Sequence, residues 1–523
     1  MRRVLSGLVL SVVAFGCGVF GAGESAPDPA PAGTPQENAQ PPAVDGSPIP
    51  GVYVSTSQGS DEGAGTPARP LKSLKKAFAL ANEQHLRVIA CAEVYAESLT
   101  LIDGVSAYGY FECAATPWKK GDRRAIVKAP ASPAVLAKGL TLPTRLEGFT
   151  VIAPDLDGVP ATETTGSSIA LEVRDSQQLV VTGSLLHGGK ASPGVDGVPG
   201  PANVITGADA PPARDQTTTT CNPMVVQCNA RTVPGGPGAV TTCAIGAAGG
   251  PGGQGGDGRF LIDCAPNTVA AEFRGRPLSA SLATAAGGLK PGSVGLPGTA
   301  GASGADGTDG VNGTWSLSAK GFVIGNGTAG GSGEPGQGGG GGAGTEVWFV
   351  GAFPGCNSPP IPFSETATGG GGGSGGCAGQ PGTAATGGGA SIGAWVVAST
   401  VSIEGTRIES SAGGRAGLGN VGGKGTSGNK PGAASILASG KLISGNGGPG
   451  GAGGNGGASG HGAAGPSIAL VFAGTRPVLT GPELVAGAGG EGQPALSGLT
   501  PFGLIKSLPA APPGASEREH EIK

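Results

Sequence analysis

Short apolar runs, separated by turn-forming residues, recur along most of the chain. Weaker copies of this pattern lie at residues 315–324 and 435–443. Strands whose side chains alternate inward and outward, with Gly, Ser and Asn at the corners, are typical of the coils of a β-helix. Each clear copy ends in a glycine-rich stretch, and these copies lie at 168–173 with 179–186, 391–397 with 401–408, and 467–472 with 477–485.

The segment before these repeats contains a helical pattern. We expect a helix that begins at Pro70, because proline is favoured in a first turn. Lysines occupy the polar side of this helix, and its apolar side consists of Leu71, Leu74, Phe78 and Ala81. Strand-like runs flank it at 52–55, 88–90, 99–101 and 105–111.

The order of these elements resembles the N-terminal cap of right-handed parallel β-helices in the pectin-lyase-like superfamily. The resemblance covers about residues 52–113, and it implies a helix that covers the open end of the first coil. The residues that carry it are Tyr53-Val54-Ser55, Gly59-Ser60-Asp61, Gly65-Thr66, Pro70-Leu71-Lys72-Ser73-Leu74 and Val88-Ile89-Ala90. We therefore expect an all-β fold, a right-handed parallel β-helix with an N-terminal capping α-helix and glycine-rich loop insertions.

The domain organisation follows from these patterns and from composition. The chain has 107 glycines and 45 prolines among 523 residues, yet 38% of its residues are hydrophobic, which argues against a solvated disordered tail. We expect a signal region at 1–23, a Pro/Ala-rich linker at 24–50, the cap and first coils at 51–113, β-helix repeats with glycine-rich insertions at 114–500, and a frayed C-terminal tail at 501–523.

The glycine-rich insertions have a three-residue period. Glycine occupies every third position from Gly292 to Gly313, and Gly-Gly-x triplets fill 447–458. Three residues per turn is the polyproline-II repeat, and proline is too scarce here for a collagen triple helix. Two alternatives stay open, namely ordered bundles of left-handed glycine helices and flexible loops.

The N-terminus indicates export. Arg2 and Arg3 precede an apolar stretch that is too short to span a bilayer. The stretch ends in Ala14-Phe15-Gly16-Cys17, which resembles a bacterial lipobox and predicts that Cys17 is a lipid anchor. Ala14 departs from the leucine usual in that motif. The alternative is an ordinary signal peptide cut near Ala22, which gives a secreted or periplasmic protein. We expect an outer-membrane or cell-surface lipoprotein.

The remaining cysteines predict disulfides, because their number is even and the protein is expected to be exported. Three near-equal gaps, 91 to 113, 243 to 264 and 356 to 377, indicate bridges between neighbouring coils or across one inserted loop. A zinc site is the weaker alternative, since no Cys-x-x-Cys occurs. The disulfide candidates are Cys91, Cys113, Cys221, Cys228, Cys243, Cys264, Cys356 and Cys377.

Candidate chemistry is sparse. Parallel β-helix lyases and hydrolases use clustered aspartates. Five carboxylates are candidates for such a cluster, but each is better explained as a turn or solubilising residue: Asp155, Asp157, Asp175, Asp306 and Asp309. The segment 252–257 resembles a single calcium-binding nonapeptide repeat, which needs tandem copies. The histidines are scattered, without a partner at a recognisable spacing, and we expect all four to be solvent or corner residues: His85, His187, His461 and His520. We therefore expect no catalytic residues, no metal and no cofactor.

These observations predict a non-catalytic cell-surface lipoprotein with a structural, adhesive or envelope-associated role. The alternative is a β-helix protein that binds or degrades polysaccharide as a lyase or hydrolase. A third alternative is a loose spacer. Expected partners are the membrane, through the lipid, and cell-surface glycans or other envelope proteins. The net charge of −4 and the 4% of aromatic residues argue against nucleic-acid binding.

Overall fold

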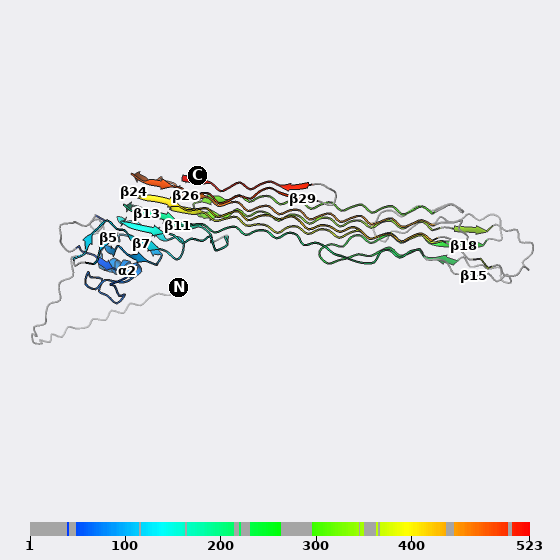
Figure 1. Cartoon of the computed structure of the whole chain (residues 1–523), viewed down its shortest axis with the longest axis horizontal. Coiled ribbons are helices and arrows are strands. Elements are labelled where there is room, and N and C mark those ends of the chain that lie inside the picture. Colours follow the sequence, from blue (N-terminus) through cyan, green and yellow to red (C-terminus); the bar gives the residue numbers. More distant parts are fainter. Residues whose placement is uncertain are drawn as a thin grey trace, which may run out of the picture.

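Three parallel sheets and one helix form one end of an elongated molecule, and long extended segments run away from that end (Figure 1). The computed structural model describes residues 39–40, 49–114, 117–162, 165–213, 219–220, 231–262, 295–344, 346–349, 362–363, 367–435, 444–499 and 505–523. The chain contributes one strand to each sheet in turn, so the three sheets form the walls of a parallel β-helix. The expected fold class is confirmed.

The strands of each sheet follow chain order along the β-helix axis. Sheet 1 contains β1 (Val52–Val54), β2 (Val88–Cys91), β5 (Ala107–Glu112), β9 (Thr144–Glu147), β12 (Leu179–Thr182), β24 (Val401–Glu404) and β27 (Val478–Thr480). Sheet 2 contains β3 (Val94–Tyr95), β7 (Ala125–Lys128), β10 (Phe149–Ile152), β13 (Leu185–Gly188), β25 (Arg407–Ser410) and β28 (Glu483–Val485). Sheet 3 contains β4 (Leu99–Thr100), β8 (Val135–Lys138), β11 (Ser168–Arg174), β23 (Ser391–Val397), β26 (Ser467–Ala473) and β31 (Ser516–Ile522).

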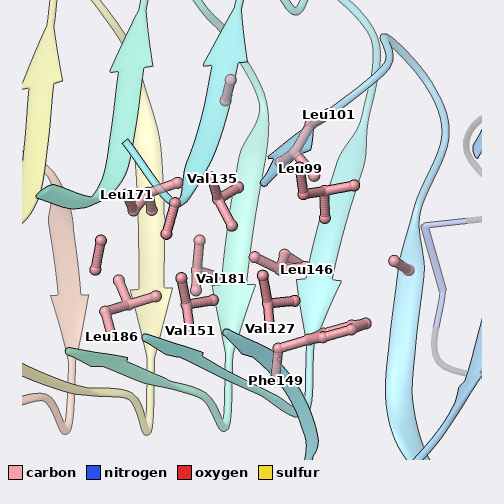
Figure 2. Close-up of a cluster of buried hydrophobic side chains, with 14 of the residues drawn as sticks. Leu99, Leu101, Val127, Val135, Leu146, Phe149, Val151, Leu171, Val181 and Leu186 are labelled. Carbon is pink, nitrogen blue, oxygen red and sulfur yellow. The ribbon is translucent and has the colours of Figure 1, made fainter. Parts of the chain in front are cut away.

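One axial core runs through the β-helix. Alternate residues of each strand point inward, and the in-register ladders stack them; for example, Val127 pairs with Val151, which pairs with Leu186. Leu146 and Val181 stack in the same way on sheet 1 (Figure 2). All five side chains are fully buried. Burial of each such side chain stabilises the fold by about 1.5–3 kcal/mol, and the shared interior explains why coils are stable only as a stack.

Helix α2 (Leu74–Gln84) covers the first coil, as the resemblance implied. Its buried face consists of Leu74, Ala77, Phe78 and Ala81. The helix begins four residues later than predicted from Pro70, because Leu71 forms a bridge with Val54 and remains extended. Ser73 is the N-cap, and the Glu97 carboxylate accepts the free N–H groups of Leu74 (2.7 Å) and Lys75 (3.0 Å).

The corner between sheets 1 and 2 requires a left-handed backbone in successive coils. Four glycines occupy it, at Gly148 (φ 76°), Gly183 (φ 55°), Gly405 (φ 49°) and Gly481 (φ 60°). A side chain at positive φ is strained, so glycine is the residue that this corner selects.

Every long glycine-rich insertion in the described chain leaves and returns at another corner, the one between sheets 2 and 3. The insertions separate β13 from β23, β25 from β26, and β28 from β31. Within them the chain runs outward and back in extended passages that lie side by side (Figure 1). Outward passages are 189–213, 249–257, 325–344, 412–435 and 487–494, and returning passages are 234–243, 295–313, 367–390, 444–466 and 509–515. We call this array the glycine bundle.

Hydrogen bonds between passages repeat every third residue. The N–H groups of Gly298, Gly301 and Gly304 donate to the carbonyl oxygens of Asn446, Pro449 and Ala452, each at 2.8 Å. A polyproline-II helix has three residues per turn and no internal hydrogen bonds, so its backbone groups are free to bond to neighbouring helices. The bundle therefore resolves the open alternative in favour of ordered glycine helices over flexible loops.

The returning passage 367–390 lies at the centre of the glycine bundle. Its backbone hydrogen-bonds to six surrounding passages: 189–213, 234–243, 249–257, 325–344, 412–435 and 444–466. The neighbours approach so closely that a Cβ atom on Gly372 or Gly375 would overlap a neighbouring carbonyl group. Interior positions are therefore restricted to glycine wherever two helices touch, and this requirement explains the Gly-Gly-x triplets.

The smaller elements differ from expectation in two places. Residues 315–324 form the antiparallel hairpin β19 (Ser316–Ser318) and β20 (Gly321–Val323) rather than part of a coil. Residues 516–522, expected in a frayed tail, form β31, which pairs with β26. The other short strands are β6 (Lys119–Lys120), β14 (Ile205–Thr206), β15 (Thr219–Thr220), β16 (Arg231–Val233), β17 (Thr242–Cys243), β18 (Gly258–Ile262), β21 (Glu346–Phe349), β22 (Pro362–Phe363), β29 (Leu496–Leu499) and β30 (Ile505–Leu508).

Candidate functional site

A serine, a histidine and a glutamate meet on the outer face of sheet 2, where the glycine bundle leaves the β-helix. His187 of β13 lies opposite Glu409 of β25 in the parallel register. The His187 Nδ1 atom is 2.7 Å from Glu409 Oε1, and its Nε2 atom is 3.2 Å from the Ser411 hydroxyl oxygen. The insertion of residues 189–390 separates the two strands along the chain, so only the stacking of coils brings these groups together.

Charged neighbours hold Glu409 in place. Arg407 Nε donates to Glu409 Oε2 (2.8 Å), and Arg407 Nη1 donates to Glu483 Oε1 (2.9 Å). Burial raises the pKa of Glu409, but hydrogen bonds from Arg407 and His187 outweigh burial and lower the pKa overall. Glu409 is therefore ionised at neutral pH and can only accept hydrogen bonds.

The backbone of Ser411 is fixed on both sides. Its N–H group donates to the Gly188 carbonyl (3.0 Å) and to the Ser391 hydroxyl (2.9 Å). Its carbonyl accepts from the Ser467 hydroxyl (2.6 Å). Three strand ends from different coils thus position one serine, while its side chain remains only partly buried.

A hollow of about 280 Å³ lies on the same face of sheet 2, at the beginning of the strands, whereas Ser411 follows their end. Leu185 and Arg407 line it. Leu185 lies two residues before His187 on β13, and Arg407 lies two residues before Glu409 on β25, so these four side chains share one face of the sheet. Arg124 and Glu483 complete its charged wall. The acidic and basic side chains of successive coils therefore converge at one place.

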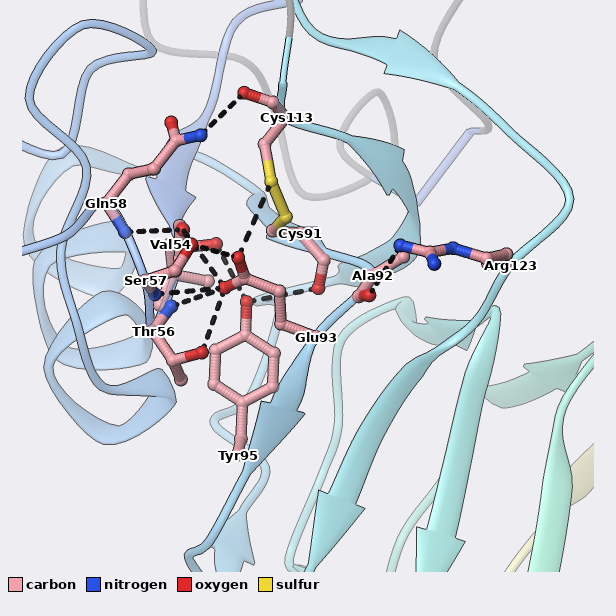
Figure 3. Close-up of a disulfide and its surroundings, with 11 residues drawn as sticks. Val54, Thr56, Ser57, Gln58, Cys91, Ala92, Glu93, Tyr95, Cys113 and Arg123 are labelled. Carbon is pink, nitrogen blue, oxygen red and sulfur yellow. Dashed lines mark hydrogen bonds between the residues drawn. A yellow bond between two sulfur atoms is a disulfide. The ribbon is translucent and has the colours of Figure 1, made fainter.

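A second polar cluster surrounds Glu93 at the start of the β-helix (Figure 3). Its carboxylate accepts hydrogen bonds from the hydroxyl groups of Ser55, Thr56 and Ser57 and from the N–H groups of Thr56 (2.7 Å) and Ser57 (3.3 Å). Burial raises the pKa of Glu93, but these hydrogen bonds outweigh burial and lower the pKa overall. The cluster fastens the loop after β1 to the first coil.

The same cluster is the one place in the described residues where three potential metal ligands lie close together, namely Cys91, Glu93 and Cys113. The two cysteines form a disulfide, so neither supplies a thiolate. The carboxylate oxygens of Glu93 already accept hydrogen bonds from Ser55, Thr56 and Ser57. We therefore interpret the cluster as structural.

The five candidate aspartates are dispersed, and most of them stabilise backbone. Asp155 accepts a hydrogen bond from the backbone N–H of Lys190 (2.8 Å), and Asp157 accepts one from the ammonium group of the same residue (3.0 Å). Asp175 occupies a corner with a φ of 47°. Asp306 and Asp309 accept N–H groups of the neighbouring passage 444–466, at 2.7 and 2.9 Å. In the 252–257 segment, Asp257 accepts the N–H of Gly235 (3.2 Å).

The histidines occupy four unrelated environments. His85 ends α2 in the left-handed conformation, and His520 contacts Glu517 (2.7 Å). His461 is fully buried in the glycine bundle, where its Nδ1 accepts the N–H of Gly419 (2.9 Å). The expectation that all four are solvent or corner residues is wrong for His461, which is buried. The partners of His187 lie 222 and 224 positions away along the chain, so no sequence spacing could have identified them.

Two disulfides lie in the described residues. Cys91 pairs with Cys113, as the 22-residue gap indicated. Cys243 pairs with Cys377, which links two passages of the glycine bundle across 134 residues and corrects the interpretation of the two 21-residue gaps. The other cysteines lie outside the described residues: Cys17, Cys221, Cys228, Cys264 and Cys356. Such bridges are typical of proteins outside the cytoplasm.

The strand topology places the chain among the parallel β-helix proteins. No family model, curated protein or solved structure was found to match it. Among the described residues, no helix combines the length and apolar character needed to cross a bilayer.

Proposed function

We propose that the protein is a bacterial envelope lipoprotein with a structural or adhesive role, tethered through Cys17 at the cell surface. In this proposal the β-helix is the base and the glycine bundle is a rigid projection from it. The helical cap over residues 52–113 supports kinship with the pectin-lyase-like superfamily, but the role does not depend on that kinship.

The observation that carries this proposal is the hydrogen-bonded order of the glycine bundle. Its central passage has neighbours on all sides, and a passage of this kind advances about 3.1 Å per residue. Residues 367–390 therefore extend for roughly 70 Å. A long bundle with few charged groups contributes reach and stiffness, and its repeated outer faces suit multivalent contact.

The lipid anchor can be tested by processing. We expect the mature N-terminus to be an acylated Cys17, and a Cys17→Ser variant to lose both the acyl label and the membrane association. Gly18→Ala is the matched control. A mature protein that begins after Ala22 would contradict the anchor.

Exposure and adhesion need a separate measurement. Protease treatment of intact cells should remove the protein if it lies at the outer surface. Cells with the wild-type protein should bind a glycan-coated or cell-coated surface better than cells that lack it. Equal binding would contradict an adhesive role, and full protection from protease would contradict surface exposure.

A second candidate function, polysaccharide binding or degradation, is favoured by the charged hollow on sheet 2. Arg124, Arg407 and Glu483 provide the donors and acceptors that recognise sugar hydroxyls. A glycan array combined with a lyase and glycosidase screen on the full chain separates the two candidates. Cleavage of a glycosidic bond would contradict the structural role, whereas binding without cleavage would support a lectin-like role.

A further inference from the structure

We propose that Ser411 is a nucleophile that hydrolyses short acyl esters of hydroxylated alcohols, with His187 as its general base and Glu409 as the residue that positions His187. The required arrangement is a hydroxyl within hydrogen-bond reach of a base that a third group orients. The two distances, 3.2 Å and 2.7 Å, meet this requirement. This activity goes beyond the structural role proposed above and does not depend on it.

The hydrogen bonds define which nitrogen of His187 carries the proton. Glu409 can only accept, so the proton between the two residues belongs to His187 Nδ1. The Nε2 atom then has a free lone pair, which accepts the hydroxyl proton of Ser411. This is the tautomer that a general base needs. Arg407 binds the other oxygen of Glu409 and leaves Oε1 for the histidine.

An unused amide lies directly after the proposed nucleophile. No hydrogen bond within the described part of the chain engages the N–H of Ala412, and this residue is exposed. Its carbonyl accepts from Ala191 (3.0 Å), which fixes the peptide that follows it. In this proposal the Ala412 amide supplies the donor that stabilises the oxyanion formed when Ser411 attacks an ester.

The surroundings define the class of ester. Arg407 binds Glu409 and also lines, with Arg124 and Glu483, the hollow further along the same face, so an alcohol part that extends from Ser411 past His187 meets polar groups, which points to a polar, hydroxylated alcohol. The chain continues from Ser411 as Ala412-Gly413, whose small side chains leave space for an acyl group, and the proposal assigns a short one such as acetyl.

The proposed reaction is balanced with water as the only co-reactant. Ser411 Oγ bonds to the acyl carbon while its proton moves to His187 Nε2, and the ester C–O bond breaks as that proton passes to the leaving alcohol. Water then adds to the acyl-serine with His187 as base. The Ser411–acyl bond breaks, and a carboxylic acid and free serine are released.

The test uses the purified full chain, a fluorophosphonate probe and 4-nitrophenyl acetate. We expect mass spectrometry to find the probe on Ser411, and Ser411→Ala to lose the adduct and at least 10³-fold of the hydrolysis rate. Ser402→Ala is the matched control, because its hydroxyl contacts Glu404 (3.1 Å) on sheet 1 without a histidine, and it should behave as wild type.

His187→Gln should lower labelling and kcat by at least 10²-fold, and Glu409→Gln should lower kcat with little change in KM. The acetyl ester should be hydrolysed faster than the octanoyl ester. Absence of labelling and hydrolysis in the wild-type protein would overturn the proposal, as would hydrolysis that survives in folded Ser411→Ala protein. Preference for the octanoyl ester would overturn the substrate class.

Discussion

Replacement of Gly375 by alanine is the sharpest test of the glycine bundle. A Cβ atom at this position would lie 1.9 Å from the carbonyl oxygen of Gly336 in the adjacent passage. Carbon and oxygen rarely approach below about 3.3 Å, so the two passages must separate by roughly 1.4 Å. The hydrogen bonds from Gly336 to Gly376 (3.0 Å) and from Gly339 to Gly373 (2.7 Å) then exceed bonding distance.

The expected loss follows from those two bonds. Each buried group left without a partner costs about 1–3 kcal/mol, so partial relaxation of the bundle leaves a destabilisation of about 3 kcal/mol. The assay is urea unfolding of the full chain, combined with hydrogen exchange of peptides from residues 325–344 and 367–390. Both peptides should exchange faster in the variant.

The matched control is Gly158→Ala. Gly158 lies in an exposed turn, has no atom within 4 Å of an added Cβ and has no left-handed φ. Alanine there should leave stability unchanged or raise it by up to about 1 kcal/mol. If Gly375→Ala showed wild-type exchange and the same unfolding midpoint as Gly158→Ala, close packing of the passages would be refuted.

Three further predictions concern the Cys243–Cys377 disulfide, the buried His461 and the partly buried Glu93. Cys377→Ala should lower the free energy of unfolding by about 2–5 kcal/mol, measured as a lower urea midpoint; an unchanged midpoint would contradict the bridge. Burial lowers the pKa of His461, so the folded chain binds fewer protons than the unfolded one and stability should fall as pH drops below about 6.5. In His461→Gln, the melting temperature should no longer fall as the pH drops through this range. If the fall persisted in the variant, His461 would not be its cause. Glu93→Gln should cost about 2–4 kcal/mol, because hydrogen bonds to a charged group are lost. Because the pKa of Glu93 is lowered in the folded protein, its carboxylate stabilises the fold above about pH 4.5. This stabilisation disappears as the pH falls through the pKa of the folded state. Glu83→Gln, at an exposed helix position, is its control, and equal midpoints would contradict the role of the cluster.

The β-helix could be predicted because its signals are local. Alternation within runs such as 168–173 and 391–397 sets the inward face, and the glycines at the corners supply the required backbone. The start of α2 was misplaced because a tertiary bridge to Val54 keeps Leu71 extended, and this bridge overrides the preference of Pro70 for a first turn.

The glycine bundle was predictable only in its period. The three-residue repeat indicates the type of helix, but the partners of each passage are set by packing between segments far apart in the chain. The pairing of Cys243 with Cys377 depends on that packing, so equal spacing between cysteines could not reveal it.

The candidate site was not predictable at all. His187 and Ser411 are 224 residues apart, and their proximity requires the β13–β25 register across a long insertion.

The outward passages of the glycine bundle continue the parallel strand pairing of sheet 2. Passages 189–213, 412–435 and 487–494 follow β13, β25 and β28, and they stay adjacent, with Gly194 bonded to Arg415 (2.8 Å) and Ala416 to Glu491 (2.9 Å). The stacked coils of the β-helix thus determine the spacing and the order of the passages that project from them. The glycine bundle can then become longer or shorter only by whole triplets of residues, which must be added to an outward passage and to the returning passage that follows it. Each triplet changes the length by about 9 Å. An insertion of one or two residues would turn every later side chain by a fraction of a helical turn and drive it into a neighbouring passage.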